Sequence, residues 1–293
     1  RPISGSDVSI GKTGNITVKL PDGTDLDAKH QVTVIVTDHK KAPQQGKNVA
    51  VKGDLGQSAA GKTDKKGELT VPEVEQTERH GVYIVGYTDG TFGPSRSMTR
   101  SEAAAIFARL LAEKNGDTIS TAANTKFADI PAHAWYSGYV KYLSNNGITY
   151  GKSKTIFAPN DAITRAEFTT MAVRFFDVYG DGDAEIMEQF SGFNDVSSGY
   201  WAAEYIKYAA LHGWINGYGD GSFHADREIN RAEVVTIVNR LLGREADEDY
   251  IADNLRKLNT FPDVSRKHWA YYAVMEAANA HTAVLGENES WSK

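Results

Sequence analysis

The amino-acid sequence predicts two domains: a small all-β sandwich over residues 1–80, followed by a mainly α, pseudo-threefold body over residues 81–293. Two observations support this division. The first 80 residues contain short segments in which apolar and polar residues alternate, separated by turn-forming residues. The remainder contains a two-part motif that recurs about every 65 residues. Alternation with a period of two is typical of strands, whereas a repeated unit of this length indicates a repeat architecture.

The first domain is predicted from its strand pattern. Alternating segments lie at residues 16–20, 32–36, 49–51 and 68–71, and turn-rich stretches at residues 21–23 and 53–54 separate them. Short alternating strands at this spacing favour a small β-sandwich. The pattern resembles the immunoglobulin-like spacers of surface proteins, and we expect a stalk without a ligand of its own.

The repeated motif has two halves, and each half occurs three times. The first half is a Phe-x-Asp triplet with a Trp eight residues after the Phe: Phe127, Asp129 and Trp135; Phe193, Asp195 and Trp201; Phe261, Asp263 and Trp269. The second half has a Gly, a Phe six residues later and an Arg eight residues after that Phe: Gly86, Phe92 and Arg100; Gly151, Phe157 and Arg165; Gly217, Phe223 and Arg231. Spacings conserved at this many positions indicate one structural unit used three times.

The order of the halves predicts a closed body. A half-unit at residues 82–112 opens the array, units at 127–176 and 193–242 follow, and a half-unit at 261–284 closes it. Because the first and last halves are of opposite kind, they can pair to complete a third unit. We therefore expect a closed pseudo-threefold body rather than an open solenoid, which would need polar caps at its ends.

Each half predicts a helix. Apolar residues recur at helical spacing after each Phe-x-Asp triplet, and the Asp of the triplet is the predicted N-cap. A second helix is predicted to start at Thr99, Thr164 and Asn230, because each is followed three residues later by Glu, the pattern of a capping box. In the loop before this helix, Asp89-Gly90 and Asp220-Gly221 favour tight turns.

These motifs, in this order, resemble the S-layer homology (SLH) family over roughly residues 80–284. The resemblance implies a three-pronged pseudo-trimer around a central helical bundle. It also implies a module that binds peptidoglycan-linked secondary cell-wall polysaccharide, often through pyruvylated amino sugars, and so anchors a surface protein without covalent chemistry. By position, it assigns ligand binding to the helix-start arginines and the loop glycines: Arg100, Arg165, Arg231, Gly86, Gly151 and Gly217.

The chemistry of these residues fits such a ligand. A guanidinium donates two parallel hydrogen bonds to a carboxylate, and a helix N-terminus attracts anions. A cation at this end is unfavourable for the helix by itself, so we favour a binding role for the arginines. A loop glycine lets a ligand approach the backbone. Two turn carboxylates, Asp89 and Asp220, are further candidates for ligand binding. So are three indoles, for which core packing is the favoured interpretation and stacking on a sugar the alternative: Trp135, Trp201 and Trp269.

The three repeats are not equivalent in sequence. The middle loop has Lys154-Thr155 where the other loops have Asp-Gly, and Asn230 replaces Thr at the third helix start. We therefore expect at least one weakened pocket, with the first repeat the best match to the family pattern.

The composition argues against several other functions. The net charge of -6 argues against nucleic acid as a partner, and no segment approaches the roughly 20 apolar residues of a membrane span. Cysteine is absent, which excludes disulfides and zinc–thiolate sites, and the eight histidines show no metal-ligand spacing. Acidic residues at 177, 181, 183 and 185 are a calcium candidate, but they depart from the EF-hand pattern and a solvated loop is favoured.

We therefore expect no catalytic residue, no metal and no cofactor, since no metalloprotease, serine-hydrolase or phosphate-loop motif is present. The expected partner is secondary cell-wall polysaccharide, the expected location the bacterial cell surface, and the expected state a monomer. Two alternatives stay open: a protein–protein module that assembles a lattice, and, because carboxylates are plentiful, part of a surface glycoside hydrolase.

Overall fold

The chain forms two compact units, and each is considered by itself. In this computed structural model, unit 1 comprises Arg1–Arg79 with Thr282–Lys293, and unit 2 comprises His80–His281. The residues that the structure describes are 7–10, 16–19, 33–37, 42–45, 48–52, 58–62, 65–66, 68–70, 76–179, 190–285 and 290–292.

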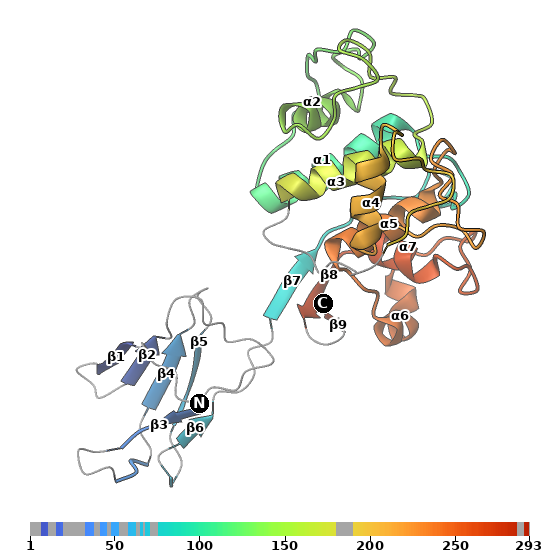
Figure 1. The fold of residues 1–293 in the computed structure, drawn as a ribbon. Coiled ribbons are helices and arrows are strands. Elements are labelled where there is room, and N and C mark those ends of the chain that lie inside the picture. Colours follow the sequence, from blue (N-terminus) through green and yellow to red (C-terminus); the bar gives the residue numbers. More distant parts are fainter. Residues whose placement is uncertain are drawn as a thin grey trace. The chain divides into compact units, whose positions relative to one another are not determined.

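The described strands belong to unit 1, except for His80 in β7 and His281 in β8, which belong to unit 2. A four-stranded sheet has the order β1-β2-β4-β5 (Figure 1), formed by β1 (Asp7–Ile10), β2 (Ile16–Lys19), β4 (Asn48–Lys52) and β5 (Ser58–Lys62). Strands β2 and β4 pair in parallel, and the other two pairs are antiparallel. A second sheet pairs β3 (Thr33–Ile35) with β6 (Glu68–Thr70), and a third has the order β7 (Gln76–His80), β8 (His281–Leu285), β9 (Ser290–Ser292).

Strands β2, β3, β4 and β6 overlap the four segments in which alternation predicted strands. The predicted turns at 21–23 and 53–54 lie outside the described residues. The immunoglobulin-like sandwich therefore stays a prediction.

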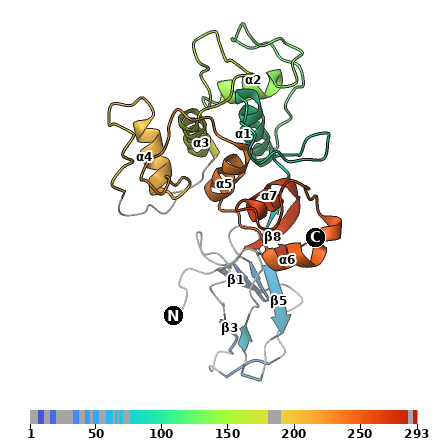
Figure 2. The ribbon, with the colours of Figure 1, turned by 90° about the vertical axis from the view of Figure 1, so that its right-hand side faces the viewer.

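Unit 2 is mainly helical, with three long helices at its centre. These are α1 (Arg100–Asn115), α3 (Arg165–Tyr179) and α5 (Arg231–Leu242), and α3 packs against both α1 and α5. Each long helix carries a shorter one (Figure 2): α2 (Ser137–Asn145) on α1, α4 (Ala203–Leu211) on α3, and α7 (Tyr271–Ala278) on α5. Helix α6 (Glu248–Asn254) and the 3-10 helix η1 (Leu255–Lys257) lie between α5 and α7 in the chain. Among the described helices, none has the length and apolar character that crossing a membrane requires.

The long helices begin where the capping boxes predicted. The side chains of Thr99 and Asn230 accept from the backbone N–H of Glu102 and Glu233, whose carboxylates accept from the cap backbone in return. The same reciprocal pair joins Thr164 and Glu167, at 3.2 Å in both directions. All three predicted helix starts are confirmed.

The starts of the long helices are joined in a closed cycle of backbone hydrogen bonds. The N–H of Met98 donates to the carbonyl of Ile229 at 2.9 Å, Ile229 to Ile163 at 3.0 Å, and Ile163 back to Met98 at 2.9 Å. Each repeat therefore donates to one neighbour and accepts from the other. This is the closed arrangement that the count of half-units predicts.

The two ends of the repeat array complete the third unit. In the two continuous units, Asp129 accepts from the N–H groups of Phe157 and Ala158, and Asp195 from those of Phe223 and His224. In the third, Asp263 of the closing half accepts from Phe92 and Gly93 of the opening half, at 2.9 and 2.7 Å.

The prediction that these aspartates N-cap the following helices is wrong. The cap positions of α2, α4 and α7 are Tyr136, Ala202 and Ala270, and none makes a side-chain cap hydrogen bond. Each carboxylate instead accepts from two consecutive backbone N–H groups of its partner loop. Charge-assisted bonds of this kind are among the stronger ones in proteins, and here they hold the halves of a repeat together.

Candidate functional site

The helix-start arginines occupy equivalent, buried positions. Arg100, Arg165 and Arg231 are 4%, 5% and 4% exposed. Each donates from Nε to the carbonyl of the aromatic residue in a neighbouring repeat: Arg100 to Phe157 at 2.8 Å, Arg165 to Phe223 at 2.9 Å, and Arg231 to Phe92 at 2.8 Å. Each guanidinium also lies 4.5–5.0 Å from the centre of that same Phe ring. Every arginine therefore ties one repeat to the next, whatever else it binds.

The positive charge at two of the three helix starts is partly balanced by a carboxylate from a neighbouring repeat. Arg100 Nη1 lies 3.2 Å from the capping-box carboxylate of Glu167, and Arg165 Nη1 lies 3.2 Å from that of Glu233. Burial lowers the pKa of Arg165, and the charges of Tyr218 and Glu233 oppose that shift. A cation near a helix N-terminus is unfavourable, and here the neighbouring glutamates offset that charge even without a bound anion.

The loop glycines make room for the Phe of the Phe-x-Asp triplet. A Cβ built on Gly86, Gly151 or Gly217 would lie 2.5 Å from a carbon of Phe261, Phe127 or Phe193, respectively. It would also lie 2.6–2.8 Å from a backbone carbonyl oxygen. Packing alone therefore requires glycine at these three positions.

Two grooves of similar composition open between repeats. The first-loop groove, of about 230 Å³, is lined among others by Gly86, Tyr87, Glu102, Arg109, Trp135 and Arg231. The third-loop groove, of about 260 Å³, is lined among others by Gly217, Tyr218, Glu233, Arg240, Trp269 and Arg165.

The two grooves correspond position by position. Each has a loop glycine and the tyrosine after it, a capping-box glutamate and an arginine seven residues later, a Trp, and the helix-start arginine of another repeat. The Arg165 guanidinium lies 5.1 Å from the Tyr218 ring centre, and that of Arg231 lies 4.6 Å from the ring of Tyr87. The predicted arginines, glycines and indoles thus meet in shared grooves at two of the three positions.

Comparison with known proteins identifies the repeats. A family model described as "S-layer homology domain" matches residues 64–104, 126–169 and 192–235. The chain carries three S-layer homology domains.

Among its relatives are proteins named for the cell surface, for cellulosome anchoring and for the surface layer. It is 34% identical over 218 residues to Cell surface glycoprotein 1 of Acetivibrio thermocellus, covering 72% of this chain and 9% of that protein. It is 30% identical over 233 residues to the Cellulosome-anchoring protein of the same species, covering 79% and 49%. It is 32% identical over 163 residues to the Surface-layer 125 kDa protein of Lysinibacillus sphaericus, covering 54% and 13%. The chain thus spans less than half the length of these relatives. Its SLH domains locate it at the cell surface and cell wall.

The three motif tryptophans of the SLH repeats are exposed rather than buried. Trp135, Trp201 and Trp269 are 54%, 56% and 65% exposed, so the interpretation as core residues is wrong. Each precedes the first residue of its short helix by two positions, where helical periodicity does not apply. Trp135 and Trp269 line the two grooves.

The predicted turn carboxylates hold the SLH loops. Asp89 accepts from the backbone N–H of Thr91 at 2.9 Å, and Asp220 from that of Ser222 at 3.0 Å. Hydrogen bonds from the side chain and backbone of these partners lower the pKa of both carboxyl groups. Neither aspartate is among the residues that line the two grooves.

The middle SLH position has different side chains. Lys152 stands where the other loops have tyrosine, with its Nζ 3.4 Å from Glu167. Arg174, the equivalent of Arg109 and Arg240, donates to the hydroxyl of Tyr205 at 3.1 Å, and its guanidinium lies 4.7 Å from the ring centre of Tyr150. Arg109 has similar partners, since its guanidinium lies 5.0 Å from the ring centre of Tyr139 and its Nη1 donates to the Tyr83 carbonyl at 3.5 Å, so the side chain that sets the middle position apart is Lys152 in place of tyrosine. The predicted inequivalence of the repeats has this physical basis.

Sequence reasoning missed several of these residues. Tyr87 and Tyr218 follow the loop glycines directly, and Arg109 and Arg240 lie seven residues after the capping-box glutamates. Since seven residues are close to two helical turns, that spacing puts Glu and Arg on one helix face and was available as a signal. The calcium candidates at 181, 183 and 185 lie outside the described residues.

Proposed function

We propose that this chain is a non-covalent wall-anchoring module, and that the first-loop and third-loop grooves bind peptidoglycan-linked secondary cell-wall polysaccharide. The observation that carries this proposal is the correspondence of the two grooves. Both combine a pair of arginines with an exposed indole. These side chains come from different repeats, which the closed cycle of three repeats (the ring) brings together.

The groove chemistry suits an anionic sugar. Arg109 is half-buried, with Nη1 3.5 Å from the Tyr83 carbonyl oxygen, and Arg240 is exposed; each lines its groove together with a buried helix-start arginine. A guanidinium recognises a carboxylate, such as that of a pyruvyl ketal, through two parallel hydrogen bonds. An exposed indole offers an apolar face for a sugar ring. Volumes of about 230 and 260 Å³ lie just below those of pockets for drug-sized ligands, so each groove suits about one sugar unit.

Two equivalent sites on one chain also suit anchoring. A polymer with repeated sugars can engage both grooves, and the second contact is then intramolecular and favoured by a high effective concentration. We therefore propose that the closed ring of a monomer supplies the multivalency that other proteins obtain by oligomerisation.

We further propose that the module is not an enzyme. Among the residues that line each groove, one is a carboxylate: Glu102 in the first and Glu233 in the third. Glycoside hydrolysis ordinarily needs a pair of carboxyl groups flanking the bond to be broken. Each of these glutamates is also committed to a capping box.

The test is co-sedimentation of the chain with purified cell-wall sacculi, before and after removal of the secondary polymer. We expect binding to be lost when the polymer is removed, and to be weakened in Arg109→Gln and Arg240→Gln. The matched control is Arg174→Gln, the equivalent position in the middle repeat, which should bind normally.

A protein–protein assembly module is the competing function. Binding that survives removal of the polymer, and that is indifferent to Arg109→Gln and Arg240→Gln, would contradict the proposal and favour that alternative.

A further inference from the structure

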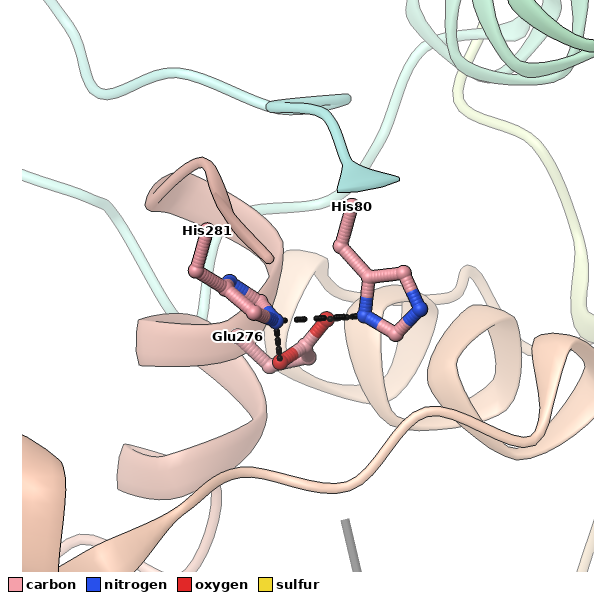
Figure 3. A group of neighbouring side chains, drawn as sticks. All are labelled: His80, Glu276 and His281. Carbon is pink, nitrogen blue, oxygen red and sulfur yellow. Dashed lines mark hydrogen bonds and ion pairs between the residues drawn. The ribbon is translucent and has the colours of Figure 1, made fainter. Parts of the chain in front are cut away.

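A buried cluster of two histidines and a glutamate lies outside the grooves, within unit 2. His80 ends β7, His281 begins β8, and Glu276 lies on α7. Their side chains point toward one another (Figure 3). The three residues are 2%, 7% and 1% exposed, respectively. One potential ligand atom from each residue lies within 4.8 Å of the others.

The spacing of these atoms is that of a first coordination shell. His80 Nδ1 lies 3.1 Å from His281 Nε2 and 3.2 Å from Glu276 Oε1, and His281 Nε2 lies 3.3 Å from Glu276 Oε2. A tetrahedral Zn²⁺ binds nitrogen and oxygen at about 2.0–2.1 Å, which separates neighbouring ligand atoms by about 3.3–3.4 Å. Each observed separation approaches that value, with His80 facing one carboxylate oxygen, Oε1, and His281 facing the other, Oε2. Calcium prefers six to eight oxygens at longer distances, so it does not fit two imidazoles.

The orientation of His281 supports ligation. Its Nδ1 lies 3.0 Å from the carbonyl oxygen of Asn279. Because a carbonyl oxygen only accepts, Nδ1 carries the proton, and in the neutral ring the lone pair of Nε2 faces the cluster. Metal-ligating histidines commonly donate their other ring N–H to a carbonyl or carboxylate in this way.

Hydrogen bonds among these three residues account less well for how their side chains face one another. With Glu276 ionised, donation from both imidazoles to its carboxylate needs a proton on His80 Nδ1 and on His281 Nε2. These nitrogens are only 3.1 Å apart, so the two N–H groups would oppose each other. A cation at the centre attracts both lone pairs and neutralises a carboxylate that is costly to bury as an ion.

We propose that His80, Glu276 and His281 form a structural site for one divalent transition-metal ion, and that Zn²⁺ is the ion that fits best. Two imidazoles and a carboxylate are a ligand set that zinc accepts, and the second carboxylate oxygen or a water completes four-coordination. Burial of all three residues favours a structural rather than a catalytic ion.

The proposed ion has a defined place in the SLH unit. His80 and His281 are the first and last residues of unit 2, and Glu276 lies on the last helix. A metal that links them closes the chain into a loop of about 200 residues, and links across long loops remove much entropy from the unfolded chain. The ion would therefore fasten the two ends of the ring that the backbone hydrogen bonds already close.

Metal binding by the untagged full chain tests this proposal. The chain is stripped with a chelator, dialysed against Zn²⁺, and analysed for bound metal by mass spectrometry. We expect one Zn²⁺ per chain, unaffected by excess Ca²⁺ or Mg²⁺, and a higher midpoint of thermal unfolding with Zn²⁺ than without. Glu276→Gln and His281→Gln should each weaken Zn²⁺ binding by at least about 100-fold. His133→Gln, a change at an exposed histidine of the same unit, should bind Zn²⁺ normally.

Cobalt keeps the proposal testable if the variants fail to fold. The wild-type chain loaded with Co²⁺ should show the intense visible absorption of a tetrahedral site. No stoichiometric Zn²⁺ in the wild-type chain, the weak spectrum of octahedral Co²⁺, or equal Zn²⁺ binding by folded Glu276→Gln would each overturn it.

Discussion

The middle repeat and the two grooves share one scaffold but differ in the side chains that a ligand would meet. In all three repeats an aspartate holds the partner loop, a glycine admits a Phe ring, and a buried arginine reaches a neighbouring repeat. The first-loop and third-loop grooves then present a tyrosine after the loop glycine, together with Arg109 or Arg240. The middle repeat presents Lys152 paired with Glu167, and Arg174 bonded to Tyr205.

This difference distinguishes residues that hold the three repeats together from residues whose side chains would contact a ligand. The ring needs all three repeats, because each donates to one neighbour and accepts from the other. On the proposed function, binding needs only the two positions that line a groove with tyrosine and a pair of arginines. A substitution in the scaffold should therefore act equally in every repeat, and a substitution in a groove should act only there.

The largest expected effect is on the scaffold. Gly217→Ala places a Cβ 2.5 Å from Phe193 and 2.6 Å from the Ser222 carbonyl, and should lower the free energy of unfolding by about 2–4 kcal/mol. Gly151→Ala in the middle repeat should cost no less, because it meets Phe127 at 2.5 Å and has a φ of +80°. Gly219→Ala, in the same loop as Gly217, has open space and should change stability by less than about 0.5 kcal/mol. Chemical denaturation measures the free energy of unfolding of the three variants. A loss of stability in Gly217→Ala but not in Gly151→Ala would contradict the view that the scaffold is the same in every repeat.

A smaller effect is expected when the middle repeat is given a groove residue. Lys152→Tyr removes a partly exposed ion pair and supplies the ring that Tyr87 and Tyr218 place over a helix-start arginine. Stability should change by less than about 1 kcal/mol, because exposed ion pairs contribute little. Affinity for sacculi should rise by up to about fivefold, as one added cation–π contact allows. A binding assay that shows weaker binding by the stable variant would mean that tyrosine is not a binding residue.

The smallest effect is expected at acid pH. Although partial burial raises the pKa of Asp195, the N–H groups of Phe223 and His224 lower it more, so that the folded pKa lies below its usual value. A depressed pKa contributes stability above the unfolded pKa of about 3.9, and that stability is lost as pH falls through the folded pKa. The free energy of unfolding should therefore decline below about pH 4 in the wild type and less steeply in Asp195→Asn. Parallel pH profiles for the two proteins would contradict this account.

The sequence was sufficient for the parts of the fold that repeat. Capping boxes at Thr99, Thr164 and Asn230 predicted the long helices, and the order of half-units predicted a ring closed by the chain ends. A capping box depends on residues three apart in the chain, and ring closure depends on the number and order of the half-units. Neither prediction requires knowledge of side-chain packing.

Packing between distant segments was harder to predict. The Phe-x-Asp carboxylates were assigned to the nearest helix, but backbone N–H groups 28 or more residues away compete for them successfully. Trp135 was expected in the core because an aromatic beside an apolar helix face usually lies there, yet it precedes that helix. His80 and His281 are 201 residues apart, so no spacing rule brings them together.

The central claim is that two grooves, and not all three repeats, bind the wall polymer. The most direct test measures the affinity of Trp135→Ala, Trp269→Ala and Trp201→Ala for intact sacculi. All three remove an indole that is more than half exposed, so their effects on stability should match. We expect about a 5- to 30-fold loss of affinity for each groove variant, as for loss of a stacking contact of about 1–2 kcal/mol, and little change for Trp201→Ala. Equal losses in all three variants, or no loss in any, would contradict the claim.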